Sequence, residues 1–204
     1  SGVTGVYNAG VYTITGTPTL AGTYSYSVTT SGGCSSATLS GTITVNSLTL
    51  PTFTFGTATT ICQNGAVETL VGTSSNGFTG TWFPSVINNT TSGVYTFTPN
   101  AGQCASTTTY TVTVQDAFDF EFETGCIGDN FTLQANPIEN GYDESTATYT
   151  WVYNSNVVGT DESFDVTSYL LSTSVNETLP ITFYLTITRA DGCSTTKPID
   201  VTNV

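Results

Sequence analysis

The sequence predicts an all-β fold made of tandem β-sandwiches, and three observations lead to this prediction. Thr is the commonest residue, and its β-branched, polar side chain suits the solvent-facing side of a strand. Apolar and polar residues alternate with a period of two in several stretches, whereas no stretch of helical periodicity is long enough to indicate a helix. The alternation also recurs along the chain as a repeat, which indicates several similar units.

Each repeat has an aromatic-rich alternating stretch, a Gly-containing turn with a Cys, and a Thr-rich alternating stretch. The three copies are GTYSYSVTTSGGCSSATLSGTITV ending at Val45, GVYTFTPNAGQCASTTTYTVTV ending at Val114 and FYLTITRADGCSTTKPIDV ending at Val201. Each copy is predicted to be the hairpin formed by the last two strands of a sandwich. The positions expected to share the buried face are Tyr24, Tyr26 and Val28 in the first copy, Tyr110, Val112 and Val114 in the second, and Ile181, Phe183, Leu185 and Ile187 in the third.

The spacing of the repeats predicts three domains. Residues 1–46 are interpreted as a partial repeat with only the later strands, residues 47–115 as a complete repeat and residues 116–204 as a longer domain. The junctions at 47–51 and 115–116 are short. Because short linkers restrict motion between neighbouring domains, the sequence predicts a semi-rigid rod.

Two tryptophans support an immunoglobulin-like arrangement of the predicted sandwiches. Trp82 and Trp151 each lie between the two Cys of their repeat, as a core Trp on a central strand does in immunoglobulin-like domains. Cys62 and Cys126, however, precede the second strand, so an antibody-type disulfide is not expected.

Trp82 and Phe83 are neighbours on a predicted strand and therefore point to opposite faces, so either ring could be exposed and stack on a sugar. The simpler interpretation places both rings in or near the core.

The five cysteines indicate a secreted protein with disulfides. One scheme pairs cysteines within repeats, as Cys62–Cys104 and Cys126–Cys193. The other scheme joins Cys62 to Cys193 of the next repeat. The sequence leaves both open, and both leave Cys34 as a free thiol at an exposed turn.

The charge distribution excludes several functions. The formal net charge is −13 with two bases, Arg189 and Lys197, so nucleic acid binding is not expected, since it needs clustered basic side chains. The absence of His removes the common catalytic triads and the commonest metal ligand, and we expect no enzymatic activity.

The acidic residues are concentrated in the last part of the chain: all but one of the 15 follow residue 115. Four of them form what we call the carboxylate row: Asp116, Asp119, Glu121 and Glu123.

The carboxylate row has two interpretations. Carboxylates at a domain junction could bind Ca²⁺, which takes six to eight oxygen ligands. The simpler interpretation is a solvated edge strand whose charges oppose association with other strands.

The sequence contains no Met and no apolar run long enough to span a membrane, so we expect a processed or partial chain that is not membrane-spanning.

The repeats resemble those of giant surface adhesins of gliding Bacteroidetes, of the SprB type. The segment VTGVYNAGVYTITGTPTLAGTYSYSVTTSGGC resembles an immunoglobulin-like repeat of these proteins, and NGFTGTWFPSVINNTTSGVYTFTPNAGQC is similar to another. The segments CIGDNFTLQA, YTWVYNSNVVGT and DGC together resemble a PKD-like domain. The resemblance implies export by the type IX secretion system, display at the outer membrane, and a role in adhesion or gliding motility.

Together these features predict an extracellular stalk segment that extends a binding tip. Its expected partners are adjacent repeats of the same chain and the secretion or gliding machinery at the outer membrane, with surface polysaccharide as a further candidate. The alternative is a carbohydrate-binding module of a secreted polysaccharide-degrading enzyme, which would use an exposed aromatic ring.

Overall fold

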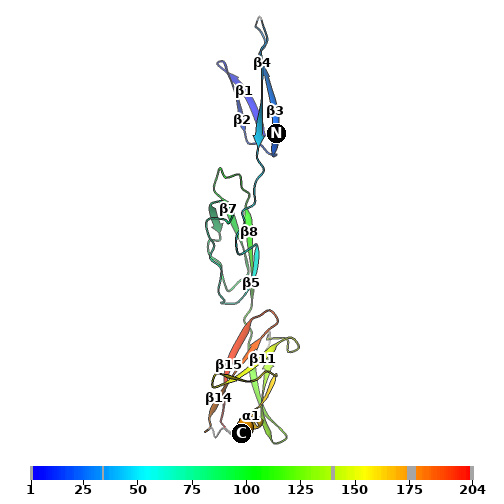
Figure 1. Cartoon of the computed structure of the whole chain (residues 1–204), viewed down its shortest axis with the longest axis vertical. Coiled ribbons are helices and arrows are strands. Elements are labelled where there is room, and N and C mark those ends of the chain that lie inside the picture. The colour runs from blue at the N-terminus through cyan, green and yellow to red at the C-terminus, as the bar shows by residue number, and fades with distance from the viewer. Residues whose placement is uncertain (1, 34, 139–140, 174–177, 203–204) are drawn as a thin grey trace. The chain divides into compact units, whose positions relative to one another are not determined.

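The computed structural model describes residues 2–33, 35–138, 141–173 and 178–202, and it is all-β apart from one short helix among these residues (Figure 1). Its elements are β1 (Val3–Asn8), β2 (Val11–Gly16), β3 (Gly22–Thr29), β4 (Thr38–Val45), β5 (Ala58–Cys62), β6 (Gly80–Phe83), β7 (Gly93–Pro99), β8 (Thr108–Gln115), β9 (Phe120–Ile127), β10 (Asn130–Pro137), β11 (Thr148–Tyr153), β12 (Asn156–Gly159), β13 (Ser163–Asp165), α1 (Val166–Thr173), β14 (Ile181–Thr188) and β15 (Ser194–Val201).

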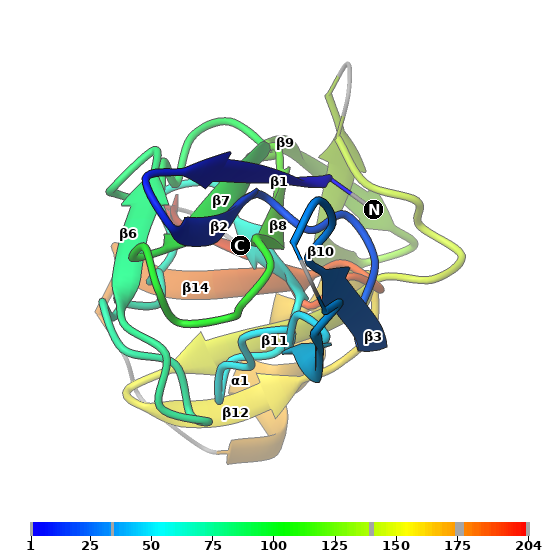
Figure 2. The same ribbon diagram turned by 90° about the horizontal axis from the view of Figure 1, so that it is seen from above.

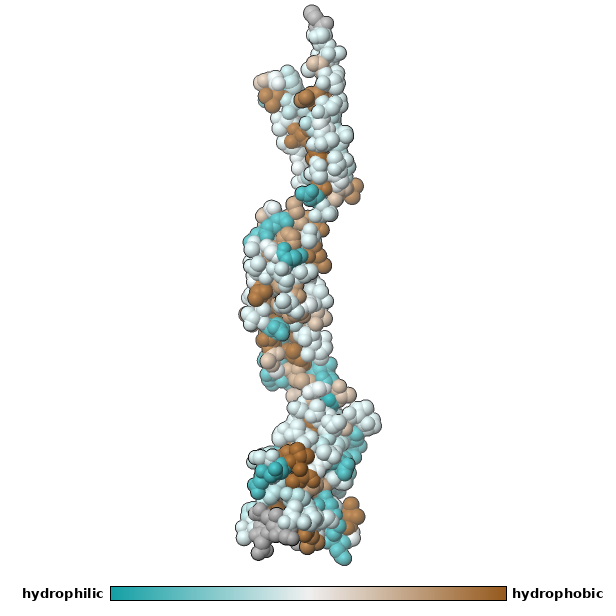
Figure 3. Space-filling model, viewed as in Figure 1, coloured by the Kyte–Doolittle hydropathy of each residue, from teal (hydrophilic) through white to brown (hydrophobic). Residues whose placement is uncertain are grey.

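The N-terminal strands form two separate antiparallel hairpins, β1–β2 and β3–β4. The two-residue turn between β1 and β2 has positive φ at Ala9 and Gly10, the conformation that matches the twist of a tight hairpin. None of the described side chains up to Val45 is buried. Apolar side chains are therefore left at the surface of these strands, as Figure 3 shows; the most exposed include Val6, Tyr7, Leu20 and Leu39.

The middle strands form one sheet in the order β5-β8-β7-β6. Strand β5 runs parallel to β8, and β6 runs antiparallel to β7. An aromatic cluster packs on this sheet: the ring of Trp82 lies 5.3 Å from that of Phe97 and 4.8 Å from that of Phe53. The Trp82 indole N–H donates to the carbonyl of Val71 at 2.9 Å, so its one polar atom is satisfied.

The C-terminal strands form two sheets over one core. One sheet has the order β13-β10-β9 and the other β12-β11-β14-β15, and β11, β12 and β14 can be followed as neighbours in Figure 2. Both sheets contribute to the core, with Phe120 and Leu133 from the first and Trp151, Phe183 and Leu185 from the second, all fully buried. The alternation in FYLTITRADGC predicted one buried face, and alternate residues of β14 are indeed buried.

Helix α1 corrects the expectation that no helix forms. Asp165 caps its first turn, because its carboxylate accepts hydrogen bonds from the backbone N–H of Ser168 at 2.8 Å and from the Ser168 hydroxyl at 2.7 Å. The helix has eight residues, which is too short for a periodicity test that needs a window of about 11.

The described residues form two compact units whose segments are interleaved in the sequence. The first contains Ser1–Thr57, Leu70–Val86 and Tyr95–Tyr110, and the second contains Ala58–Thr69, Ile87–Val94 and Thr111–Val204. The second unit therefore includes strand β5 together with the C-terminal sheets, and it contains the disulfide described next.

Candidate functional site

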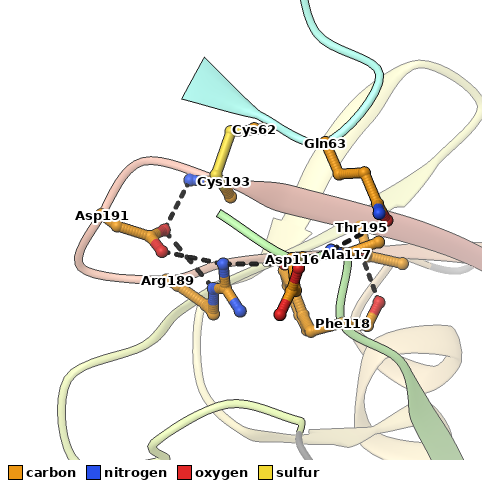
Figure 4. Close-up of a disulfide and its surroundings, with 9 residues drawn as sticks. All are labelled: Cys62, Gln63, Asp116, Ala117, Phe118, Arg189, Asp191, Cys193 and Thr195. Atoms are coloured by element: carbon orange, nitrogen blue, oxygen red, sulfur yellow. Dashed lines mark hydrogen bonds and ion pairs between the residues drawn. A yellow bond between two sulfur atoms is a disulfide. The ribbon is translucent and has the colours of Figure 1, made fainter. Parts of the chain in front are cut away.

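A disulfide joins Cys62 to Cys193 inside the second unit, with 5.5 Å between the two Cα atoms (Figure 4). Cys62 is the last residue of β5, and its strand is held by parallel pairing with β8, in which Cys62 faces Gln115. Cys193 closes the turn between β14 and β15 and is 4% exposed. The bond covers a sequence separation of 131 residues, so it closes most of the chain into one covalent loop.

The turn that carries Cys193 is fixed by short-range hydrogen bonds. Gly192 has φ of +86°, a conformation that glycine adopts without strain, and its N–H donates to the carbonyl of Arg189. The N–H of Cys193 donates to the carboxylate of Asp191 at 2.9 Å, and the N–H of Arg189 donates to the carbonyl of Cys193. These bonds orient the Cys193 side chain towards β5.

Arg189 ties the same turn to the segment that leads into β9. Its guanidinium forms a salt bridge with Asp191 at 2.8 Å and donates to the carbonyl of Asp116 at 3.1 Å. Its Cζ atom also lies 4.9 Å from the centre of the Phe118 ring, within the range of a cation–π contact. Figure 4 shows this side chain between the turn and residue Asp116.

Further contacts continue along the segment. The Thr195 hydroxyl donates to the carbonyl of Phe118 at 3.0 Å, and the Lys197 ammonium donates to the carbonyl of Phe120 at 2.6 Å. Lys197 also pairs with the carboxylate of Asp119 at 2.6 Å. Both basic residues of the chain, Arg189 and Lys197, thus bind one stretch of backbone to β14 and β15.

Gln63 holds the other side of the disulfide. Its backbone N–H donates to the carbonyl of Gln115 at 2.8 Å, and its side-chain oxygen accepts from the N–H of Ala117 at 3.3 Å. Cys62 is therefore anchored by β5–β8 pairing on one side and by the Gln63 contacts on the other. We call the disulfide and these surrounding residues the stapled joint; they are Cys62, Gln63, Asp116, Ala117, Phe118, Arg189, Asp191, Cys193 and Thr195.

The carboxylate row does not converge on a point. Asp119 is engaged by Lys197, whose hydrogen bond lowers the pKa of the carboxyl below its ordinary value of 3.8. Glu121 is exposed, and Glu123 accepts a hydrogen bond from the Asn136 amide at 2.8 Å. Strand β9 lies at the edge of its sheet. Within the described parts of the chain, no three carboxylate, Cys or His side chains come close enough to hold a metal ion.

The structure has the Cys62–Cys193 scheme and not the pairs Cys62–Cys104 and Cys126–Cys193. Cys104 and Cys126, the partners in the within-repeat scheme, are exposed free thiols. Cys34, expected as a free thiol, lies outside the described residues.

The two tryptophans are both buried: Trp151 is fully buried and Trp82 is 7% exposed. The indole N–H of Trp151 donates to the carbonyl of Asp161 at 2.9 Å. Phe83, on the opposite face of β6 from Trp82, is 80% exposed. Of the neighbours Trp82 and Phe83, the exposed ring is therefore Phe83.

Sequence reasoning did not assign roles to Gln63, Arg189 or Lys197. One signal in the sequence could have indicated two of them. The chain has only two basic residues among many acids, and both lie within ten residues of one Cys.

None of the described helices is long and apolar enough to cross a membrane.

No protein-family model matches the chain, and no curated protein matches it either.

Proposed function

We propose that this chain is a load-bearing stalk segment of a repetitive extracellular adhesin. In this proposal its sandwiches are immunoglobulin-like and PKD-like, and they extend a binding tip used for attachment or gliding. The chain reaches the outer surface through the type IX secretion system, and its partners are adjacent repeats and the secretion or gliding machinery.

The observation that carries the proposal is the disulfide between Cys62 and Cys193. Stable disulfides form in oxidising, extracytoplasmic compartments. Tension applied to the two ends of the chain passes through a disulfide rather than through the loop that it closes. The residues between the two cysteines are thereby protected from extension, which is the property that a stalk under shear requires.

The composition of the chain supports the same function. Thr and Ser are the commonest residues at the exposed strand positions. Strand β9 presents Glu121 and Glu123 at a sheet edge, where charge opposes pairing with other strands. These features favour a structural segment.

The test is attachment under flow in cells that display the chain at their surface. When cells are compared at matched display levels, a Cys62→Ser, Cys193→Ser double variant should detach at lower shear than wild type. Thr111→Ser, at an exposed position of β8, is the matched control and should detach at the wild-type shear. Equal attachment of the double variant and wild type would overturn the load-bearing role.

One observation favours the second candidate, a carbohydrate-binding module. Phe83 is 80% exposed, and Val86, three residues further along the chain, is 74% exposed. Aromatic rings can stack on the faces of sugars. Pull-down with insoluble polysaccharides should then retain the wild type and lose the Phe83→Ala variant; no retention of the wild type would remove this candidate.

A further inference from the structure

Strand β4 has an edge that none of the described strands occupies. Among the described residues β4 pairs with β3 alone, whereas β8 pairs with β7 on one side and with the parallel strand β5 on the other. Strands β4 and β8 correspond in the sequence, since their repeats end at Val45 and Val114. The hairpin β3–β4 is therefore a counterpart of β7–β8 in which no described strand takes the position of β5.

The backbone of β4 presents hydrogen-bonding groups at this edge. The N–H of Thr30 donates to the carbonyl of Ala37 at 2.9 Å, just beyond the last strand pair of the hairpin. Hydrogen-bonded and non-hydrogen-bonded pairs alternate along antiparallel strands, so the N–H and C=O groups of Thr42 and Thr44 point away from β3. An edge of this kind is a template for one more strand.

Strand β8 binds β5 through residues at the same positions. The carbonyl of Gln115 accepts a hydrogen bond from the N–H of Gln63, the residue after β5, at 2.8 Å. Alternate residues of a strand direct their backbone groups to the same side, so Thr111 and Thr113 also face β5. Counted back from the last valine of each repeat, these two threonines are at the positions of the two outward threonines of β4. The open edge of β4 thus matches the edge of β8 that a parallel strand covers.

The turn that carries Cys104 is bound to the segment that follows β4. The N–H of Thr49 donates to the carbonyl of Cys104 at 2.9 Å, and the N–H of Ser106 donates to the carbonyl of Thr49 at 3.0 Å. Thr49 is four residues after Val45, and Ser106 is two residues after Cys104. The exposed thiol is therefore held close to the end of β4.

The turn that carries Cys193 has the same relation to β8. Thr195, two residues after Cys193, donates to the carbonyl of Phe118, which is four residues after Val114. The two turns differ in their thiols: Cys193 is bonded to the cysteine that ends β5, whereas Cys104 is exposed and free. Relative to the end of β8, the described end of β4 thus lacks a strand and the cysteine that ends it.

We propose that the edge of β4 binds a strand of the β5 type, which comes from a polypeptide segment outside residues 1–204. The strand runs parallel to β4 and ends in a cysteine that bonds to Cys104, so that a second stapled joint forms. Strand β5 itself is not the donor, because it is paired with β8 and its cysteine is bonded. Since Cys62 faces Gln115, one residue beyond the last valine of its repeat, the incoming cysteine lies opposite Asn46.

The side chains of β4 define the chemistry of the incoming strand. Ile43 and Val45 line a cavity of about 360 Å³ together with Tyr12. In the existing pair, Ile61 of β5 lies beside Val114, so the incoming strand should carry a β-branched apolar residue opposite Val45. The first 67 residues of the chain contain no charged side chain, and no charge on the strand would find a partner among them. The strand is therefore uncharged, as β5 is. This inference goes beyond the proposed stalk function and does not depend on load bearing.

The bond forms by thiol–disulfide exchange with a small disulfide. The Cys104 thiolate attacks the small disulfide, and one thiol leaves. The cysteine thiolate of the bound strand then attacks the Cys104 sulfur of the mixed disulfide, and the second thiol leaves. Two protein thiols are oxidised, the small disulfide is reduced to two thiols, and the two protons pass to the leaving groups.

The experiment uses the full chain with Cys34→Ser and Cys126→Ser, in which Cys104 is the remaining free thiol. The probe is a synthetic peptide of residues 57–66, TATTICQNGA, in a buffer of reduced and oxidised glutathione. Mass spectrometry of alkylated, unreduced samples measures the fraction of Cys104 bonded to the peptide and verifies that the Cys62–Cys193 bond is intact. Two proline peptides form a matched pair. In the β5–β8 pairing the N–H of Thr59 points to β8, and that of Thr60 points away.

The native peptide and the Thr60→Pro peptide should bond to Cys104 to the same extent, within about twofold, since proline is tolerated at an outward edge position. The Thr59→Pro peptide should bond about tenfold less, because one hydrogen bond to β4 is lost and its carbonyl is left unpaired. Thr42→Pro in the chain should weaken bonding of the native peptide by a similar factor. In the wild-type edge, amide exchange of Thr42 and Thr44 measured by NMR should slow when the native peptide is bonded.

The two proline peptides are compared on the same folded chain, so the test does not depend on the folding of the Thr42→Pro variant. Equal bonding of the Thr59→Pro and Thr60→Pro peptides would overturn the proposal, because Cys104 would then react without strand pairing. Unchanged amide exchange of Thr42 and Thr44 would overturn it as well. Formation of a Cys104–Cys104 dimer in preference to the peptide adduct would assign the site to a second copy of the chain and would also overturn it.

Discussion

The Cys62–Cys193 disulfide should determine how far the chain can be stretched. The perturbation is the loss of this bond, either by a reducing agent or by the Cys62→Ser, Cys193→Ser double variant. With the bond intact, force applied at the two ends extends only the residues outside the loop. Without it, the whole chain becomes extensible once its sheets unfold.

The size of the effect follows from the sequence separation of 131 residues. At about 3.5 Å per extended residue, the loop hides about 46 nm of contour length. All 204 residues would extend to about 71 nm, so the oxidised chain should reach about 25 nm. The bond also restricts the unfolded chain; for a loop of this length the chain-entropy model gives about 5 kcal/mol of stabilisation, which is the upper end of measured values.

The assay is single-molecule force spectroscopy with handles attached at the two ends of the chain. Wild type should gain about 46 nm of final contour length when a reducing agent is added. The double variant is the control: it should show the longer contour length in both conditions, which separates loss of the bond from other effects of the reducing agent. An equal contour length of wild type with and without reducing agent would refute the reasoning.

Three further predictions concern a buried tryptophan, three carboxyl groups and calcium. Trp151→Ala should lower the free energy of unfolding by about 3–5 kcal/mol, because it empties a fully buried site, whereas Phe83→Ala should change it by less than about 0.5 kcal/mol; chemical denaturation of both variants measures the contrast. Hydrogen bonds from Lys197, from Ser145 and from Ser168 lower the pKa of Asp119, Asp143 and Asp165, respectively, below 3.8. The unfolded state therefore binds more protons in acid, so the stabilisation from these three carboxylates is fully present above the ordinary pKa of 3.8 and is lost as pH falls through the lower folded-state pKa values. Denaturation curves measured from neutral pH into this acid range should show a decrease in the free energy of unfolding that is absent from the triple variant with all three Asp residues changed to Asn. An equal decrease in both proteins would contradict the assignment. Millimolar Ca²⁺ should leave the melting midpoint at its value in chelator, since the carboxylate row does not converge; an upward shift would show a site that the described residues do not reveal.

The strands and their buried faces could be predicted from the sequence, because alternation is a local property. The residues expected on one face of β14, Ile181, Phe183, Leu185 and Ile187, are at most 4% exposed. In β8, Tyr110 and Val112 are fully buried as expected. The hairpin predicted to end at Val45 forms as β3–β4, but none of its described residues is buried, because burial depends on what packs against a strand and not only on the strand's own pattern.

The stapled joint could not be derived in the same way. Cys62 and Cys193 are 131 residues apart, and spacing alone did not choose between the two pairing schemes. Gln63 acts through a backbone N–H and a side-chain amide, and neither has a sequence signature. Helix α1 depends on a cap at Asp165 and on packing against the core, which outweigh a sequence rich in β-branched and hydroxyl residues.

The stapled joint also explains why the compact units do not follow the sequence repeats. Strand β5 belongs to the middle repeat by sequence but to the second unit by contact. The disulfide supplies a covalent link from β5 to the last hairpin, and Gln63 adds hydrogen bonds to the segment after β8. Arg189 and Lys197 then fix that segment to β14 and β15. Because these contacts share one backbone stretch, residues 116–120, removal of the disulfide alone should leave β5 held by β8 and Gln63. Separation of β5 from the C-terminal sheets therefore requires both the covalent and the hydrogen-bonded parts of the joint to break.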